Sequence, residues 1–340
     1  MTTFRLLAGA LVATFNLLSV AQAGFDVPDS VFSVADLANG ADTRPIKNMY
    51  TFGDSYTDNC NGARFWVKDN VNAIFPYPKC PPPPIGRADY GLSWPEIVQN
   101  YRPDWNVSIY AVSAATCDSN VNSQGSIDIN GQIQLFQTRF KRELFPRGLT
   151  DDPATTVATL LVGGNDLALI QAKAWGTLPS YAKSTGSIQD NAMCIKSKLN
   201  ALHKLGFRRF LLFELPPIDK GQMVGDTPAH AASTAQLIAT RNSLAAQYSQ
   251  DLVKQWNDNS TVTIFPTVKL LTPMVELNPA FKFKYGKGTY CNAVCGNPFD
   301  YAWADDLHVS FRAFTLMAYA VVKQLDPNWR KGVPLFSDIQ

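Results

Sequence analysis

The sequence predicts an α/β fold with three layers, in which a central parallel sheet is covered by helices on both faces. Two observations lead to this prediction. Short apolar runs rich in β-branched residues alternate with longer segments whose apolar positions recur every three or four residues. Each short run is also bounded by Gly, Pro, Asn or Asp, the residues that punctuate strands. In such folds ligands bind at the carboxyl ends of the strands, so polar residues that directly follow a strand are the first candidates for chemistry.

The amino-terminal segment is expected to be an export signal. Met1–Arg5 carries one positive charge, Leu6–Val20 is mostly apolar, and Ala21-Gln22-Ala23 provides the small residues typical of a signal-peptidase site. The apolar run has about 15 residues, fewer than the roughly 20 that span a bilayer, which disfavours a membrane anchor. We therefore expect residues 1–23 to be removed and residues 24–340 to form a single secreted, soluble domain.

Seven segments carry the predicted alternation of strand and helix. The expected strands are, in chain order, Asn48–Phe52, Val107–Val112, Thr156–Val162, Phe207–Leu215 and Val262–Phe265. The expected helices are Ile188–Leu205, which Gly206 ends, and Ala229–Trp256. Residues 60–90 interrupt this rhythm with several prolines, so we expect them to form an insertion pinned by a disulfide.

The chain has six cysteines, and an even number in an exported chain predicts three disulfides. Pairing of near neighbours gives Cys60–Cys80, Cys117–Cys194 and Cys291–Cys295. The alternative of a zinc site at the last pair lacks a second ligand pair at suitable spacing, since His308 is the only histidine nearby. Two glycosylation acceptors, at Asn106 and Asn259, suit a secreted glycoprotein.

The composition excludes some classes of partner. With 46% hydrophobic and 17% charged residues, the chain can bury a core and is too apolar to be disordered. The formal net charge is only +2 and no run of basic residues occurs, so nucleic acid is not an expected partner. We expect a monomer that does not associate with membranes.

The histidines are the first candidates for a base that works near neutral pH, and the chain has three. His203 is expected near a helix carboxyl end, where a cation is favourable, and His230 at the surface. His308 follows Asp305 by three residues, a spacing that lets the carboxylate bond Nδ1 and leaves Nε2 to face a nucleophile. The alternative for Asp305 is a cap on the helix to come.

Two further polar residues directly follow expected strands. Ser55, in Gly53-Asp54-Ser55, is a candidate nucleophile, and the alternative is a helix start, because Ser55 and Asp58 resemble a capping box. Asn165, in Gly163-Gly164-Asn165-Asp166, carries an amide that can donate to an oxyanion, and the alternative is an ordinary Gly-Asn turn. Several other enzyme motifs are absent, including His-Glu-x-x-His, Gly-x4-Gly-Lys and Gly-x-Ser-x-Gly.

This combination resembles the GDSL, or SGNH, hydrolase family, whose four blocks cover about residues 48–325. The resemblance implies a flavodoxin-like α/β/α sandwich, a serine esterase activity and no metal or organic cofactor. It makes Ser55 the nucleophile, His308 the base and Asp305 its orienting partner. The oxyanion hole would consist of the backbone N–H groups of Ser55 and Ala114 and the side-chain amide of Asn165. Within the family, the leader and the sequence around Ser55 look similar to secreted fungal acetyl esterases of carbohydrate esterase family 16.

Ala114 departs from the family pattern, which usually has Gly at this place in the second block. Ala also has a backbone N–H, so the donor remains if the local angles suit a residue with a Cβ. A position that requires positive φ would distort the hole, and a lost donor costs on the order of 10²–10³ in rate. Val309 replaces the family's usual Pro after the histidine, at a position that touches no reacting atom.

The substrate is expected to be a carboxylic ester, in the first place acetylated xylo-oligosaccharide of plant cell walls. Tyr301 and Trp303 precede the expected catalytic turn and are candidates for stacking on a sugar ring, although aromatic residues there also suit the core. One alternative function is a lipase or phospholipase that accepts longer acyl chains. The other is a carbohydrate-binding protein that has lost turnover through Ala114. Esterase activity is expected to rise roughly between pH 5.5 and 7.5, as a histidine of ordinary pKa loses its proton.

Overall fold

The computed structural model describes residues 42, 44–62, 91–139, 143, 145–277, 281–291, 295 and 297–329. The expected signal segment, most of the expected insertion at 60–90 and Cys80, the expected partner of Cys60, lie outside these residues. In the described part of the chain, no helix combines the length and the apolar composition that a bilayer crossing requires.

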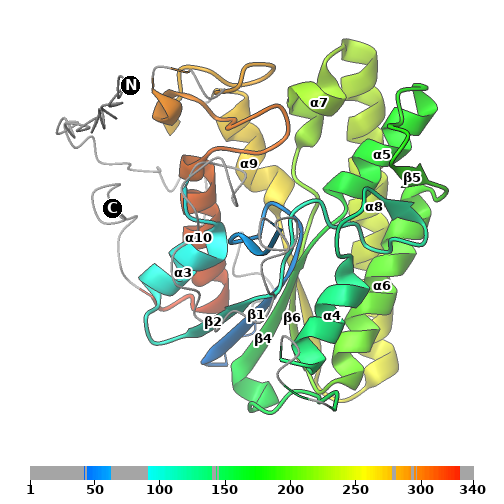
Figure 1. The fold of residues 1–340 in the computed structure, drawn as a ribbon. Coiled ribbons are helices and arrows are strands. Elements are labelled where there is room, and N and C mark those ends of the chain that lie inside the picture. Colours follow the sequence, from blue (N-terminus) through cyan, green and yellow to red (C-terminus); the bar gives the residue numbers. More distant parts are fainter. Residues whose placement is uncertain are drawn as a thin grey trace, which may run out of the picture.

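A five-stranded parallel sheet forms the centre of the molecule (Figure 1). Its strands are β1 (Asn48–Gly53), β2 (Asn106–Ile109), β4 (Thr156–Leu161), β6 (Arg209–Phe213) and β7 (Thr261–Phe265). All five lie within or beside the segments expected from the sequence, so the predicted sheet is confirmed. Their spatial order is β2-β1-β4-β6-β7. The chain therefore adds β2 on one side of β1 and then adds β4, β6 and β7 in turn on the other side. The switch point therefore falls between β1 and β4, where doubly wound folds place their ligand sites.

Helices cover both faces of the sheet, as the sequence predicts (Figure 1). One face carries α3 (Trp94–Tyr101), α9 (Thr267–Val275) and α10 (Phe311–Leu325). The other carries α4 (Ile129–Gln137), α6 (Ile188–Lys204) and α8 (Pro228–Trp256). The two long helices predicted from periodicity, α6 and α8, are confirmed to within about a residue at each end.

Strand periodicity explains the two cores on which these helices pack. Side chains alternate between the faces of a strand, so Met49 of β1 joins the core under α3 and α10, whereas Phe52 joins the core under α4 and α6. In β6 the same alternation places Leu211 and Phe213 in the first core and Leu212 in the second.

Shorter elements surround the carboxyl end of the sheet. A two-residue strand, β3 (Asn122–Ser123), pairs antiparallel with β5 (Lys183–Ser184). Helix α5 (Gly164–Ala174) follows β4, and α7 (Gln222–Gly225) precedes α8. Three 3₁₀ turns complete the described chain: η1 (Pro153–Thr155), η2 (Ile218–Lys220) and η4 (Pro298–Asp300).

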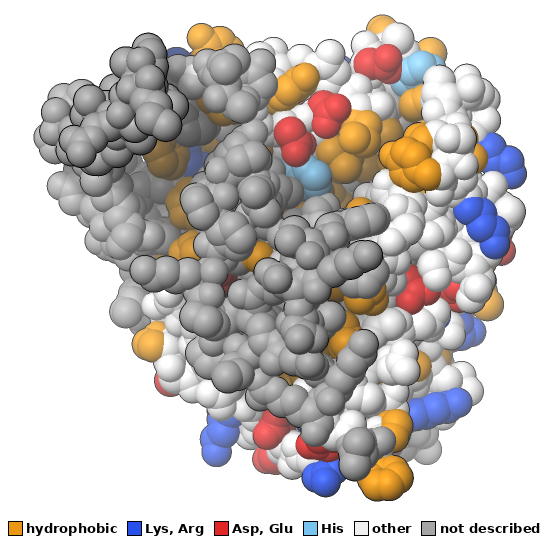
Figure 2. Space-filling model, in the orientation of Figure 1, with side chains coloured by type: hydrophobic (Ala, Val, Ile, Leu, Met, Phe, Trp, Pro, Cys, Tyr) orange, Lys and Arg blue, Asp and Glu red, His pale blue; other side chains and the backbone are white. Residues whose placement is uncertain are grey.

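Two disulfides lie within the described residues, and both were expected. Cys117–Cys194 joins the segment after β2 to α6, and Cys291–Cys295 closes a short loop before η4. On the face shown in Figure 2, acidic and basic side chains are scattered among uncharged ones, and its described residues form no extended basic patch.

Candidate active site

Ser55 lies in a tight turn at the carboxyl end of β1. The backbone N–H groups of Thr57 and Asp58 both donate to the carbonyl of Asp54, at 2.9 and 3.0 Å, which closes the turn around Ser55. The preceding Gly53 is required by close packing, because a Cβ there would lie 2.3 Å from the carbonyl oxygen of Leu161 in β4. The nucleophile candidate is therefore held where β1 and β4 approach each other closely.

The two alternatives based on helix capping, a capping box of Ser55 with Asp58 and a helix cap by Asp305, do not agree with the structure. Asp58 accepts the N–H groups of Asn61 and Gly62, while the hydroxyl of Ser55 bonds a histidine, so the capping-box alternative for Ser55 is wrong. Helix α10 begins after Ser310 rather than after Asp305, so the helix-cap alternative for Asp305 is also wrong.

Ser55, His308 and Asp305 form an unbroken chain of hydrogen bonds. Ser55 Oγ lies 2.6 Å from His308 Nε2, and His308 Nδ1 lies 2.7 Å from Asp305 Oδ2. The other carboxylate oxygen of Asp305 accepts the backbone N–H groups of Leu307 and His308, at 2.8 and 2.6 Å, which fixes the carboxylate within its own turn. With Nδ1 protonated toward Asp305, Nε2 can accept the proton of the Ser55 hydroxyl.

Asp305 is held in its charged form. Burial raises the pKa of its carboxyl, but the hydrogen bond to His308, the charge of that histidine and the N–H donors of the turn outweigh burial and lower the pKa below its usual value. An ionised Asp305 would stabilise a positive charge on His308 if that histidine took a proton.

The other two histidines also have aspartate partners, and the comparison shows what distinguishes His308. His203 Nε2 lies 2.8 Å from Asp258, and its ring stacks on Trp256. His230 Nδ1 lies 2.6 Å from Asp226 and stacks on Trp175. Within the described residues, only His308 bonds both a carboxylate and a serine hydroxyl. A His–Asp pair alone is therefore not diagnostic in this chain.

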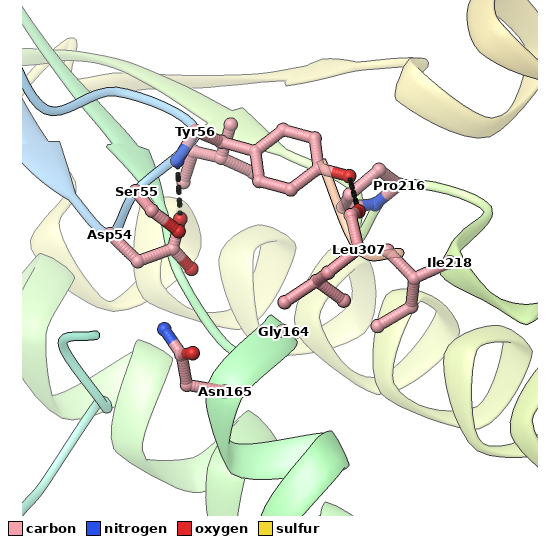
Figure 3. A pocket seen from close by; sticks show the side chains of 9 residues that line it. Asp54, Ser55, Tyr56, Gly164, Asn165, Pro216, Ile218 and Leu307 are labelled. Atoms are coloured by element: carbon pink, nitrogen blue, oxygen red, sulfur yellow. Dashed lines mark hydrogen bonds between the residues drawn. The ribbon is translucent and has the colours of Figure 1, made fainter. Parts of the chain in front are cut away.

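Asn165 lies in the first turn of α5, directly after β4, and not in the free-standing turn that was its alternative. Its amide nitrogen donates to the carbonyl of Ala115 at 2.9 Å, and its oxygen accepts the side-chain amide of Gln124 at 2.8 Å. These two bonds determine which way the amide faces and leave one N–H of Asn165 for a ligand. Figure 3 shows this amide pointing from α5 toward Asp54 and Ser55.

Ala114 occupies a turn beside the end of β1, in which the N–H of Ala115 donates to the carbonyl of Val112 at 3.1 Å. Its φ is +63°, the left-handed conformation that Gly adopts most readily. Asp58 supports the turn by accepting both the N–H and the hydroxyl of Ser113, at 2.7 and 2.6 Å. In the described part of the chain, no acceptor bonds the backbone N–H of Ala114 or that of Ser55. Within the described residues, both N–H groups thus keep their capacity to donate to a ligand.

Tyr56 joins the turn that carries Ser55 to the turn that carries His308, which we call the histidine turn. Its hydroxyl donates to the carbonyl of Leu307 at 2.7 Å (Figure 3). Its ring centroid lies 5.5 Å from that of His308. The hydroxyl is buried, so this bond is shielded from water. Tyr56 therefore fixes the separation between the two turns that carry Ser55 and His308.

A buried group of charges lies beneath the site. Burial raises the pKa of Asp54 to about 7, and the nearby carboxyl of Asp166 adds to this effect. Arg241 of α8 is fully buried and donates to the carbonyls of Val162 and Phe213, at the carboxyl ends of β4 and β6. Its charge favours the ionised form of Asp54 and so opposes the effect of burial.

A small apolar pocket opens beside Ser55 (Figure 3). Ser55 and Asn165 lie at one side, and Pro216, Ile218 and Leu307 form the facing wall. The volume open to the centre of a water molecule is about 10 Å³, so the pocket has room for about one water molecule.

The structure places the two aromatic candidates for sugar binding differently. Trp303 is 1% exposed and belongs to the core under α10, so the expectation that it offers a face to a sugar is wrong. Burial of its large ring against the sheet outweighs any exposure at the turn. Tyr301 is partly exposed and stacks on Tyr285, with ring centroids 4.5 Å apart. Its role in substrate binding stays a prediction.

Sequence reasoning missed the residues that support the candidate site. Asp54 and Tyr56 flank Ser55, but their burial depends on contacts with distant segments. Gln124 and Arg241 carry no local pattern at all, because Gln124 meets Asn165 from 41 positions away and Arg241 reaches Val162 from 79. Only the Ser55-x-x-Asp58 spacing gave a signal, and it suggested a cap rather than support for Ser113.

Comparison with known families matches residues 49–321 to a family described as GDSL-like Lipase/Acylhydrolase. Among curated proteins, the chain is 32% identical over 176 residues to an acetylesterase from Hypocrea jecorina. This alignment covers 49% of the chain and 47% of that protein, so the chain spans about half the length of the curated relative that it matches.

Solved structures that are similar to the chain include the following two. A member of the lipolytic protein G-D-S-L family from Veillonella parvula DSM 2008 has a TM-score of 0.42 and 14% identity, covering 82% of this chain and 97% of its own. An acetyl xylan esterase from Geobacillus stearothermophilus has a TM-score of 0.42 and 11% identity, covering 85% and 97%.

Proposed function

The chain belongs to the GDSL-like lipase/acylhydrolase family, and from this membership we propose that it is a serine esterase that removes acetyl groups from carbohydrate. Ser55 is the nucleophile, His308 the general base and Asp305 the group that orients His308. The backbone N–H groups of Ser55 and Ala114 and the amide of Asn165 form the oxyanion hole.

The reaction proceeds in two halves. Ser55 Oγ bonds the ester carbonyl carbon while its proton moves to His308 Nε2, and the carbonyl oxygen becomes an oxyanion that accepts the three N–H groups. The bond to the alcohol then breaks as His308 returns the proton to the leaving oxygen. In the second half, water gives a proton to His308 and attacks the acyl group on Ser55, which releases the acid and restores the hydroxyl.

The observation that carries this proposal is the Ser55–His308–Asp305 chain, with distances of 2.6 and 2.7 Å. Both distances lie in the range of a nucleophile activated by an oriented base. The N–H groups of Ser55 and Ala114 supply the donors that acyl transfer needs. A serine with a purely structural role would not need such donors.

Two observations support acetyl esters as the substrate. The curated relative that aligns over 176 residues is an acetylesterase. The pocket beside Ser55 has room for little more than a methyl group, which suits an acetyl group and disfavours the long acyl chains that a lipase or phospholipase accepts.

The disulfide Cys117–Cys194 is compatible with an oxidising compartment, so we place the enzyme outside the cell.

The test is release of acetate from acetylated xylo-oligosaccharides at pH 7 by the protein and by Ser55→Ala. We expect release by the parent and a loss of at least about 10³-fold in the variant. If neither releases acetate but the parent cleaves long-chain esters, the carbohydrate assignment fails and the esterase assignment stands. Glycan binding that Ser55→Ala leaves unchanged, with no ester cleavage by the parent, would instead support the non-catalytic alternative.

A further inference from the structure

The far wall of the pocket beside Ser55 consists of apolar side chains from two segments. Pro216 and Ile218 come from the connection between β6 and α8, and Leu307 comes from the turn that carries His308. Figure 3 shows Ile218 and Leu307 across the pocket from Asn165. An acyl group on Ser55 whose oxygen meets the amide of Asn165 would direct its chain toward this wall.

Ile218 is fixed in place by its neighbours. It begins the 3₁₀ turn η2 and is 0% exposed. Pro216 and Pro217 precede it, and their rings restrict the backbone. The N–H of Gly221 donates to the carbonyl of Ile218 at 2.9 Å, which closes the turn. The wall therefore cannot move away from an acyl chain without unfolding this turn.

The η2 segment is also tied to the histidine turn. The N–H of Met223 donates to the carbonyl of Asp306 at 2.9 Å. A Cβ on Gly221 would lie 2.9 Å from that same carbonyl oxygen, so the two segments are in close contact. The apolar wall and the histidine turn thus pack as one unit. These contacts fix the distance between the wall and His308, and with it the depth of the pocket.

A second cavity, of about 530 Å³, lies against the same segment. Pro216 and Ile218 line the small pocket, whereas Pro217 and Asp219 line the larger cavity. The alternation shows that a single stretch of chain separates the two spaces. Space for a longer acyl group is therefore present nearby, and the side chains of this stretch keep it apart from Ser55.

We propose that Ile218 determines the acyl-chain length of the esterase by closing the pocket just beyond a methyl group. This inference rests on the proposed function, because it assumes an acyl group on Ser55. Ile218→Ala removes the γ and δ carbons, which is more than the ethylene unit by which butyryl exceeds acetyl. Ile218→Val removes only the δ methyl and opens the pocket less.

The test measures kcat/KM on p-nitrophenyl acetate, propionate, butyrate and octanoate. For the parent we expect a preference for acetate over butyrate of at least about 10-fold, since one excess methylene in a pocket costs roughly 10–200-fold. Ile218→Ala is expected to reduce this ratio by about 10-fold or more through a gain on butyrate. Ile218→Val is expected to gain first on propionate.

Ile97→Ala is the matched control, because Ile97 of α3 is also 0% exposed in the same core but does not line the pocket. It is expected to lower the thermal midpoint while leaving the acetate-to-butyrate ratio unchanged.

Three outcomes would overturn the inference. The first is an unchanged acetate-to-butyrate ratio in folded Ile218→Ala, or in Ile218→Val if the alanine variant does not fold. The second is an equal shift of this ratio in Ile97→Ala. The third is a parent that cleaves octanoate as well as acetate. A parent that cleaves none of the esters would refute the proposed function instead, so the two failures can be told apart.

Discussion

Ala114 shows how a backbone conformation suited to glycine is kept by another residue. At φ +63° its Cβ crowds the following carbonyl, a strain of roughly 1–2 kcal/mol. The hydrogen bonds of Asp58 to Ser113, and of the Ser126 hydroxyl to the carbonyl of Ser113 at 2.6 Å, hold the turn on its amino-terminal side. The departure from the family pattern therefore changes the strain in the turn but leaves its N–H in place.

Ala114→Gly is expected to stabilise the protein by about 0.5–1 kcal/mol. Relief of the strain exceeds the greater freedom that Gly gives the unfolded chain. Activity should remain, because the N–H donor is unchanged. Chemical denaturation measures the difference, with Ala115→Gly as the control, since Ala115 has no positive φ and should lose stability. A destabilised Ala114→Gly would contradict the strain.

Asp54 provides a prediction for the dependence of stability on pH. Its pKa is about 7 in the folded protein, against an ordinary value of 3.8. Between these values the folded state holds a proton that the unfolded state releases, so the contribution of Asp54 to stability falls as pH rises from about 4 to about 7. Above that range the charged carboxylate stays buried at full cost.

Asp54→Asn is expected to flatten this part of the stability profile and to raise the thermal midpoint at pH 8 relative to the parent. The amide is neutral at every pH, and its oxygen can still accept the N–H of Tyr56, which Asp54 accepts at 3.1 Å. Scanning calorimetry from pH 4 to 8 measures the effect. Asp251→Asn, at an exposed position of α8, controls for loss of one carboxyl. Parallel profiles for Asp54→Asn and the parent would show that Asp54 is already charged throughout.

At the scale of secondary-structure elements, the candidate site depends on the turn after β1, the first turn of α5 after β4 and the turn that precedes α10. The sequence predicted the strands because β-branched runs are a local signal. Ser55 and Asn165 became candidates because they follow such strands, and Asp305 and His308 became candidates through their spacing of three residues. The link between the turns was not predictable, because the hydroxyl of Tyr56 bonds a carbonyl 251 positions away.

Tyr56→Phe tests this link. Loss of the hydroxyl leaves the buried carbonyl of Leu307 without its donor, and we expect a loss of stability of about 1–2 kcal/mol. Because the His308 turn then shifts relative to Ser55, kcat on acetate esters should fall by about 10-fold while KM changes little. Steady-state kinetics separate the two parameters.

Tyr50→Phe is the matched control for that variant. Tyr50 lies on the strand that precedes Tyr56, and its hydroxyl bonds Asp151 away from the site. It should lose stability but keep kcat. Equal losses of kcat in the two variants would show that Tyr56 acts only through general stability.

At the scale of the whole molecule, the two described disulfides differ in the length of chain that they enclose. Cys117 and Cys194 are 77 positions apart, and Cys291 and Cys295 are 4 apart. Replacing both cysteines of the first pair by Ala should cost about 4 kcal/mol, and replacing those of the second about 2 kcal/mol, because a longer loop restricts the unfolded chain more. Denaturant midpoints of the two double variants measure the difference. The reverse order would contradict the loop-length argument.

The sequence predicted the arrangement of the whole molecule better than the environment of single side chains. Alternation of strand and helix determines the layers and the sheet, because each element buries the face that its own periodicity creates. The depth of a side chain depends on what covers it from elsewhere. Trp303 precedes the turn of Asp305 and His308 in sequence yet lies in the core, and Ile218 gave no local signal although it lines the pocket.

The distance along the chain between Ser55 and His308, 253 positions, has a consequence for biosynthesis. All five strands of the sheet precede His308, so a nascent polypeptide can assemble the described sheet before the base proposed for Ser55 has been synthesised. Helix α10, which covers one face, follows within a few residues of His308. Under the proposed mechanism, premature termination anywhere before residue 305 would thus yield a chain with an intact Ser55 and no turnover. If the proposed function holds, ester cleavage by this protein therefore requires that synthesis has passed His308 and that the turn of Asp305 and His308 has folded against the turn of Ser55.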